Sequence, residues 1–496
     1  CLHYVDLERF DSFQVQGKAL LFIIILGLGG SFQVGCHLTL ISSPSPFIRR
    51  FINSSWTLRY GEAPGEETLT LIWGAVVTSY AIGGLIGAVS VGFVINHVGR
   101  KKAMIWNNAL NIVALAIMMI SKVVNSFEMI MLSRFLFGLT SGLCGNIHVI
   151  YLGESAPKKI RGTVTVTVGT FLGIGKLTGQ TAGLSEILGR EEFWNILLCV
   201  PAFFSFIHII TLPFFPDAPR YLLLEKGELE ECKKALQSLW GPGDYKLEIE
   251  EMQVEMDALK GQRNKSVLEL LRDSHVRWQC LSLVTVYTAI QFCGISAISV
   301  YAFSIFEEAG IPMDKIRYVT LGIGASEILT SFMCSLVIDR VGRRVLLWAG
   351  FAIMAAIMLL LTVTVQLKDY DFWIPYSTVG LVFLFVIFYG GGPAAVNTPL
   401  SYEMFVQSDR SAAFTLMAVL VWGGFIVFSF VFPFLEGALM SFSFLIFSCV
   451  GLAASIYIFF LLPETKGKTP LEIADDFRKI RVCGSPPEDK YLETQL

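Results

Sequence analysis

The sequence predicts an all-α membrane protein with twelve transmembrane helices, arranged as two bundles of six. Three observations lead to this prediction: an apolar composition, long continuous apolar runs and an internal repeat. Hydrophobic residues make up 54% of the 496 residues and charged residues only 16%, with a mean hydropathy of +0.61. Because an average soluble domain is about 25% charged, this composition indicates a chain that is largely embedded in lipid.

The apolar runs define the individual spans. A helix needs about 20 apolar residues to cross a bilayer, and it satisfies its own backbone hydrogen bonds there. The runs are continuous and do not alternate with polar residues, which excludes a transmembrane β-barrel. The first run is too long for a signal peptide and lacks a cleavage site, so we expect it in the mature chain. The predicted spans are 19–41, 70–94, 103–121, 127–150, 163–186, 193–214, 278–302, 316–338, 346–366, 374–400, 412–434 and 439–462.

An internal repeat divides these spans into two halves. Three motifs recur in the same order and at nearly the same offset: GRKK and GRR, YLGESAPKKIRG and SYEMFVQSDRSA, and PFFPDAPR and LLPETKGK. Three matches in order are strong evidence of duplication, although each alone is weak. The predicted organisation is an N-terminal bundle in 1–214 with a loop at 42–69, a polar linker in 215–277, a C-terminal bundle in 278–462 and a tail in 463–496.

The distribution of charge predicts the orientation. The basic loops at 99–102, 157–161 and 340–344 fall on one side of the membrane in a twelve-helix count, and that side is expected to be cytosolic. Both termini then face the cytosol. The loop 42–69 lies outside and contains the glycosylation acceptor Asn53-Ser54-Ser55. We therefore expect an integral protein of the plasma membrane, glycosylated at Asn53. In its cytosolic linker we expect short amphipathic helices, and the alternative is a solvated linker.

Several functional classes find no support in the sequence. The ten cysteines show no metal-binding spacing, and no basic stripe suited to nucleic acid is present. Neither a Walker loop nor a GxSxG or HExxH motif occurs. The chain is thus not expected to be an enzyme, to need a cofactor or metal, or to bind nucleic acid. The expected partners are a small-molecule substrate and the lipid bilayer.

The repeated motifs resemble those of a known superfamily. Two halves of six helices, basic loops after the second and eighth spans, and Glu/Arg pairs after the fourth and tenth resemble the major facilitator superfamily. GRKK, ESAPKKIRG, PDAPR and PETKGKT are similar to its sugar porter signatures, over essentially the whole chain. NSSW, LPFFPDAPRYLL and VGRRVLL resemble the class II branch of the facilitative glucose transporters. The resemblance implies the major facilitator fold and uniport of a hexose such as glucose or fructose, or of a related small polar solute, by alternating access.

The resemblance also implies a cytosolic gate built from charged residues. In the family, such residues hold the two halves together on the cytosolic side when the cavity faces outward. They lie at predicted helix ends, where Arg–carboxylate forks and helix dipoles favour pairing. The alternative is that these charges only set the topology, but the acids recur in both halves. The residues are Arg100, Glu154, Arg161, Asp217, Arg220, Arg343, Glu403, Arg410 and Glu464.

The implied substrate site departs from the family pattern. Gln291, Tyr301 and Trp422 remain, whereas Gly169, Glu327 and Val421 stand where related hexose porters carry an amide. Ser296 replaces an Asn, and Thr398 replaces a Trp. A buried hydroxyl left without a hydrogen bond costs about 1–3 kcal/mol. The loss of these amides therefore predicts weakened or redirected sugar binding.

Charged residues appear near the lost amides. Lys176 and Gln180 share a helix face with Gly169, and the resemblance places that face on the cavity. Glu327 belongs to the other half, so we expect it to pair with Lys176, or the two to hold opposite ends of a polar or charged substrate. The alternative is that Lys176 snorkels to a membrane interface. His37 is either a pH-sensitive group or a neutral hydrogen-bonding residue.

Three functional hypotheses follow. The first is a hexose uniporter. The second keeps the fold and carries another solute, an organic anion or a proton-coupled substrate. The third is a non-transporting sensor, and the complete set of gate motifs argues against it.

Overall fold

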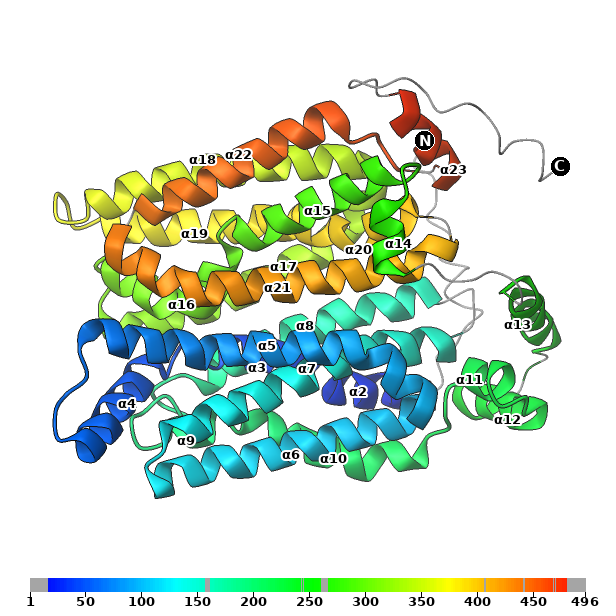
Figure 1. Ribbon diagram of the computed structural model, residues 1–496, viewed down its shortest axis with the longest axis horizontal. Coiled ribbons are helices and arrows are strands. Elements are labelled where there is room, and N and C mark those ends of the chain that lie inside the picture. The colour runs from blue at the N-terminus through cyan, green and yellow to red at the C-terminus, as the bar shows by residue number, and fades with distance from the viewer. Residues whose placement is uncertain are drawn as a thin grey trace.

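The computed structural model describes residues 17–156, 161–241, 243, 245–259, 266–405, 407–439, 442–466, 468 and 470–479. Every regular element among these residues is helical, which confirms the predicted all-α class. Figure 1 shows long helices running roughly parallel, with the N-terminal half below the C-terminal half. The helix α4 lies at one end of the bundle, which we call the α4 end, and α11, α12, α13 and α14 lie at the other, the linker end.

The N-terminal half contains the first six spans. Its first span is split at Gly30, which lies against His148: a Cβ on Gly30 would stand 2.6 Å from the Cβ of His148. The sixth span is likewise built from short consecutive pieces. The elements are α2 (Gly17–Gly29), α3 (Ser31–Thr39), α4 (Ser45–Tyr60), α5 (Glu66–Val98), α6 (Arg100–Val124), α7 (Phe127–Ser155), α8 (Arg161–Ala182), α9 (Trp194–Leu197), α10 (Val200–Thr211) and η1 (Leu212–Phe214).

The C-terminal half contains the other six spans. Its seventh span is broken at Gly294, whose φ of +106° suits glycine, and its tenth is broken at Gly392. The elements are α15 (Arg277–Phe292), α16 (Ile295–Glu308), α17 (Met313–Val341), α18 (Arg343–Gln366), α19 (Ile374–Gly391), α20 (Pro393–Met404), α21 (Gln407–Leu439), α22 (Ser443–Leu461) and α23 (Pro470–Lys479).

Glycines set the closest helix contacts. On α5, a Cβ at Gly83 would stand 2.0 Å from the carbonyl oxygen of Phe135, and on α7 a Cβ at Gly138 would stand 1.9 Å from that of Tyr80. The helices α3 and α8 meet in the same way, through Gly35 and Gly175. Small residues let helix backbones approach where lipid supplies no hydrophobic driving force. The sequence thereby fixes α8 firmly against α3.

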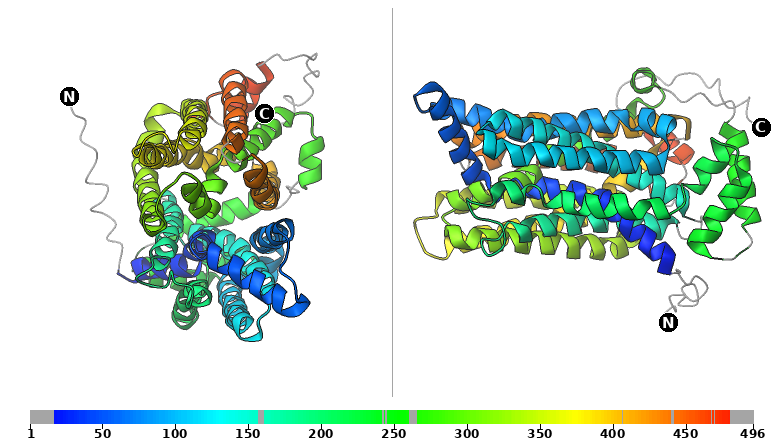
Figure 2. Two further views of the ribbon diagram at one scale, coloured as in Figure 1. Left: turned by 90° about the vertical axis from the view of Figure 1, so that its left-hand side faces the viewer. Right: turned by 90° about the horizontal axis from the view of Figure 1, so that it is seen from below.

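The two halves meet mainly along two pairs of helices. α5 packs against α21, and α8 packs against α17. The views in Figure 2 show the two bundles side by side. Within the described residues, ten helical segments are long and apolar enough to cross a membrane, and α8 and α17 complete the twelve predicted spans. The chain is therefore an integral membrane protein.

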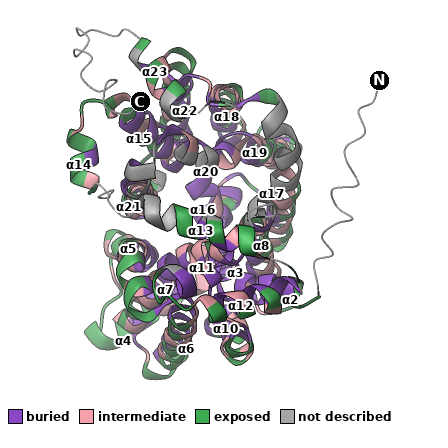
Figure 3. Cartoon of the chain, turned by 90° about the vertical axis from the view of Figure 1, so that its right-hand side faces the viewer, coloured by how far each residue is buried: buried purple, intermediate pink, exposed green. Residues whose placement is uncertain are grey.

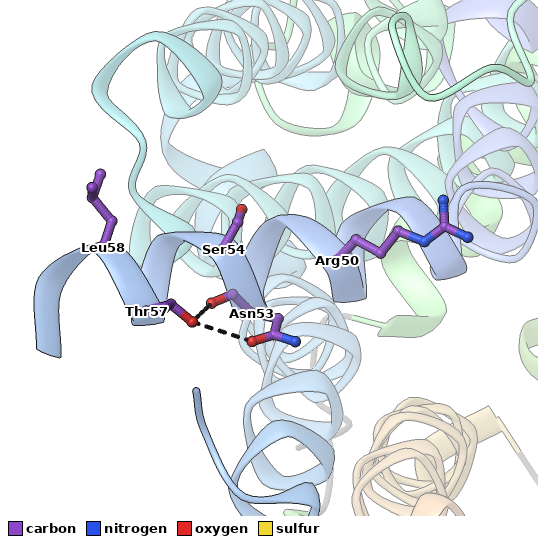
Figure 4. A pocket seen from close by; sticks show the side chains of 5 residues that line it. All are labelled: Arg50, Asn53, Ser54, Thr57 and Leu58. Atoms are coloured by element: carbon purple, nitrogen blue, oxygen red, sulfur yellow. Dashed lines mark hydrogen bonds between the residues drawn. The ribbon is translucent and has the colours of Figure 1, made fainter. Parts of the chain in front are cut away.

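The predicted loop at 42–69 contains a helix. The helix α4 occupies Ser45–Tyr60 and ends at Gly61, whose φ is +79°. Asn53 is exposed on it, beside Thr57 and Arg50 in a shallow hollow on the surface (Figure 4). Ser55 is buried, and its hydroxyl donates to the carbonyl of Asn125 over 2.7 Å. Asn53 thus stays accessible while its sequon partner anchors α4.

Short helices occupy the linker between the halves, as the charge spacing predicted. They are α11 (Pro219–Leu224), α12 (Leu229–Trp240), α13 (Lys246–Leu259) and α14 (Val267–Arg272). α11 packs on α7 and α12 on α2, whereas α14 packs on α15 and α21. Figure 3, viewed from the linker end, shows α11, α12 and α13 over the N-terminal half and the junction. The linker is therefore divided between the two halves.

Candidate solute pathway and gates

An ion pair joins the two halves near the middle of the bundle. Lys176 on α8 and Glu327 on α17 are in direct contact, and Lys176 is 9% exposed. The predicted contact is therefore present, and the ammonium group binds a carboxylate of the opposite half. A charge buried in a membrane protein is costly unless it is paired. Whether these two groups bind substrate remains a prediction.

Glycines let α8 and α17 approach each other around this pair. A Cβ at Gly173 of α8 would stand 2.9 Å from Ile328, and a Cβ at Gly324 of α17 would stand 1.8 Å from Oε1 of Gln180. That amide oxygen is buried and has no hydrogen-bond partner among the residues that the structure describes. The predicted face of α8 thus does lie against the other half, and it carries a free hydrogen-bond acceptor.

A small cavity lies next to Gln180, towards the α4 end. It leaves about 10 Å³ for the centre of a water-sized sphere, about the space for a single water molecule. Most of the residues that line it are polar, and they come from both halves: Thr39, Ser42, Ser43, Gln180, Gly183, Phe303, Arg317 and Thr320. At this point the two halves are therefore in close contact.

The sequence analysis missed the side chains that close this end. The guanidinium of Arg317 on α17 donates to Ser43 over 3.1 Å and to Ser185 over 3.0 Å. Its neighbour Tyr318 donates to Glu186. A signal was available: Arg317, Thr320, Gly324 and Glu327 follow the three- and four-residue spacing of one helix face.

The residues retained from the family pattern fall into separate groups. Gln291 lies in the last turn of α15, and Ser296 on α16 donates to its Oε1 over 3.4 Å. The hydroxyl of Tyr301 donates to the carbonyl of Ser429 on α21 over 2.8 Å. Trp422 reaches across to α5, where a Cβ on Gly84 would stand 2.2 Å from its ring. Thr398 belongs to α20, and its side chain lies outside the described residues.

His37 lies in a buried polar group on α3. It is 1% exposed and stacks on Phe137 with ring centroids 4.4 Å apart. Its carbonyl accepts from Arg134 over 3.3 Å, and that guanidinium lies 4.5 Å from the ring centroid of Tyr80. Nε2 of His37 has no protein partner among the described residues. His37 is thus placed beside a cation, and its part in substrate binding stays a prediction.

Arg100 and Glu154 form the charge cluster of the N-terminal half. Nε and Nη2 of Arg100 donate to the two oxygens of Glu154, both over 2.9 Å. Nη1 lies 2.7 Å from Glu225, and the guanidinium stacks on Tyr221 at 4.7 Å. Arg220 adds positive potential at Glu154. Glu225, in the linker, was not foreseen because it lies outside the repeated motifs.

The C-terminal half contains the corresponding cluster. Nη2 of Arg343 donates to Glu403 over 2.9 Å, and the other oxygen of Glu403 accepts from Thr465 over 2.7 Å. The side chains of Arg161 and Arg410 lie outside the described residues. The Arg100–Glu154 and Arg343–Glu403 ion pairs of these two clusters each join helices of a single half. The predicted bridging between halves belongs to an outward-facing state and stays a prediction.

The third repeated motif supplies an acid at equivalent helix starts. Asp217 accepts from the backbone N–H of Lys101, over 3.3 Å, at the beginning of α6. Glu464 accepts from the N–H groups of Arg343, over 2.9 Å, and Arg344, over 3.2 Å, at the beginning of α18. Carboxylates stabilise helix N-termini because they satisfy free N–H groups and oppose the dipole. The repeat therefore places the same carboxylate cap at the start of a helix in each half.

Two corresponding spans are each interrupted and form two shorter helices. The first span breaks at Gly30 and the seventh at Gly294, which are corresponding positions in the two halves. Interrupted spans in corresponding positions are the typical sequence sign of a transporter binding site. Gln291 and Ser296 flank the second break. The arrangement suits a solute held between the halves by hydrogen-bonding groups.

Comparison with known proteins adds three kinds of match. The family described as "Sugar (and other) transporter" matches residues 22–477. The human "Solute carrier family 2, facilitated glucose transporter member 9" is 38% identical over 462 residues, which cover 93% of this chain and 85% of that protein. Human member 11 is 38% identical over 467 residues, with 94% of each chain covered. Member 5 of Equus caballus is 37% identical over 496 residues, with 99% of each covered.

Solved structures match the fold. The inward open conformation of the xylose transporter XylE from E. coli gives a TM-score of 0.75 at 19% identity, covering 92% of this chain and 99% of that one. Its partially occluded inward open conformation gives 0.75 at 18% identity, covering 92% and 100%. At this identity the likeness concerns the fold alone. It agrees with the two-bundle architecture described above.

Proposed function

This chain belongs to the sugar transporter family, and on that premise we propose that it carries a hexose such as glucose or fructose, or a related small polar solute, by alternating access. Transport is passive uniport in this proposal. The observation that carries it is the division of contacts: the charge clusters of the linker end stay within each half, whereas Lys176–Glu327 and Arg317 cross between halves. Two bundles of this kind can rock about a site between them.

We infer the orientation from charge and from α4. The basic loops at the linker end favour the cytosol for that end and for both termini. The exposed Asn53 on α4 suits glycosylation on the outside. In this orientation, the structure is closed to the outside. A plasma membrane location accords with that topology.

The polar groups between the halves suit an uncharged, hydroxyl-rich solute. Lys176 and Glu327 neutralise each other, and Gln180 and Gln291 supply one amide from each half. Hydroxyl groups both donate and accept, so one sugar can replace several of these contacts. The relatives named as facilitated glucose transporters support this substrate class.

Uptake into proteoliposomes tests the proposal. Purified protein should give saturable uptake of labelled glucose or fructose that is the same with and without a pH gradient. Uptake driven by a proton gradient would replace uniport with symport. Absence of uptake of both sugars would contradict the proposal and favour another solute or a sensor.

The Lys176–Glu327 pair favours one second candidate, a charged solute such as an organic anion. An anion would bind Lys176 and displace Glu327 from it. If the solute is an anion, Lys176→Ala should abolish uptake of anions and leave uptake of other solutes. If the protein is a hexose transporter, the same substitution should reduce uptake of all its solutes together. Lys315→Ala is a suitable control, because that lysine contacts Tyr376 of its own half.

A further inference from the structure

We propose that Arg317 is the residue that closes the solute pathway at the α4 end, by tying α17 to two segments of the N-terminal half. This inference rests on the proposed function and extends it to a specific positioning residue. Arg317 belongs to none of the repeated motifs. Its role is argued from its contacts, from what lies behind it and from its place on α17.

The contacts of Arg317 span both halves. Nε donates to the hydroxyl of Ser43 over 3.1 Å, and Nη1 donates to the hydroxyl of Ser185 over 3.0 Å. Ser43 follows α3 and Ser185 follows α8. The guanidinium also lies 5.8 Å from the ring centroids of Phe47 and Phe303. One planar fork thus holds two separate segments, which a flexible ammonium group does less well.

The two acceptors are themselves fixed. Ser43 donates to the carbonyl of Gly183 over 2.7 Å while it accepts from Arg317, which uses both capacities of a hydroxyl. Arg190 donates to the carbonyl of Ser185 over 2.7 Å. Tyr318, next to Arg317, donates to Glu186 in the same segment. The hydrogen-bond acceptors of Arg317 are therefore held in position within the N-terminal half.

Polar side chains extend from Arg317 towards the middle of the protein. The small cavity next to Arg317 is lined by Thr320 and by Gln180, whose amide oxygen has no partner within the described part of the chain. One turn further along α8 is Lys176, paired with Glu327. On α17, Arg317, Thr320 and Glu327 share a face. Release of Arg317 would connect this row of polar side chains with the α4 end.

Cysteine accessibility tests the gate without any need to know the solute. Thr320→Cys, in the full-length protein in sealed membranes, is treated with a membrane-impermeant thiol reagent from the α4 side, with the unchanged protein as background. Arg317→Ala should raise the rate of labelling about tenfold, since two charge-assisted hydrogen bonds that favour the closed state are lost. Arg317→Lys should give an intermediate rate.

Two further variants keep the test decisive. Ser43→Ala combined with Ser185→Ala removes the acceptors and leaves Arg317 in place, so it should also raise labelling. Lys315→Ala changes a nearby cation on the same helix that contacts Tyr376 of its own half over 3.3 Å, and it should leave labelling unchanged. Thermal unfolding of each variant checks that it is folded.

The outcomes separate the gate from the transport function. Faster labelling in both the Arg317 and the serine variants supports the gate, even if neither sugar is taken up. Labelling equal to that of the Thr320→Cys protein alone in both variants overturns it, even if hexose uptake is demonstrated. A rise in Lys315→Ala equal to that in Arg317→Ala also overturns it, since the effect would then be one of general charge.

Discussion

The two ends of the molecule are built in different ways. At the linker end, each half closes its own cluster of Arg, Glu and a capping acid, and the two clusters are related by the repeat. At the α4 end, Arg317 and Tyr318 of one half bind loops of the other, with no repeated counterpart. The comparison teaches that the repeated charges stiffen each half, whereas unrepeated side chains hold the halves in this state.

The largest expected effect comes from breaking the central pair. Glu327→Ala leaves Lys176 buried without its carboxylate, and loss of one partner of a buried pair costs about 3–5 kcal/mol. We expect a large fall in thermal stability and in folded yield. Lys176→Ala combined with Glu327→Ala should recover much of that stability. Thermal unfolding in detergent measures both, and a Glu327→Ala protein as stable as the unchanged one would contradict the account.

The linker-end clusters predict coupling within a half and none between halves. Arg100→Ala removes the fork to Glu154, and hydrogen bonds between charged groups contribute about 1.5–3 kcal/mol. A double-mutant cycle on unfolding should therefore show strong coupling between Arg100 and Glu154. The matched cycle of Arg100 with Glu403, in the other half, should show about none. Equal coupling in the two cycles would remove the distinction between the two ends.

The contact of Trp422 with α5 predicts a smaller effect. Gly84→Ala would place a methyl group 2.2 Å from the indole ring, and such overpacking costs about 1–3 kcal/mol. Stability and transport should both decrease. Gly153→Ala serves as the control, because nothing lies within 4 Å of a Cβ there. If the two substitutions behave alike, Trp422 does not set the spacing of the halves.

The smallest effect concerns pH at the α4 end. The hydrogen bond from Tyr318 lowers the pKa of Glu186 below its ordinary value. The ionised carboxylate therefore favours the closed state above the ordinary pKa, and this contribution is lost as the pH falls through the lowered pKa. Because Glu186 is exposed, acid should raise Thr320→Cys labelling by less than about twofold. Glu186→Gln should abolish that dependence, and a pH profile unchanged by the substitution would exclude Glu186 as its source.

Sequence reasoning predicted the spans because apolar length is dictated by the bilayer. It also predicted the Lys176–Glu327 contact, since two charges buried in opposite halves need partners. It did not predict Arg317, because the contacts of that residue depend on how the segment 183–190 folds back over α3. Glu225 was missed for a similar reason: only the path of the linker brings it to Arg100.

Helix α4 shows another limit of the sequence. Its residues are too polar to read as a span, and its anchoring depends on Ser55 reaching Asn125, which is distant in the chain. The broken first and seventh spans were likewise not foreseen. Their glycines lie within continuous apolar runs, where glycine alone is a weak signal.

Distances between spin labels measure the difference between the two ends most directly. One pair, at Ser54 and Asp314, spans the halves at the α4 end; the other, at Lys102 and Lys234, lies within the N-terminal half at the linker end. With Arg317→Ala, and with saturating glucose or fructose, the first distance should shift or split into two populations while the second stays constant. A change in the second distance as large as that in the first, or no change in the first, would contradict the account.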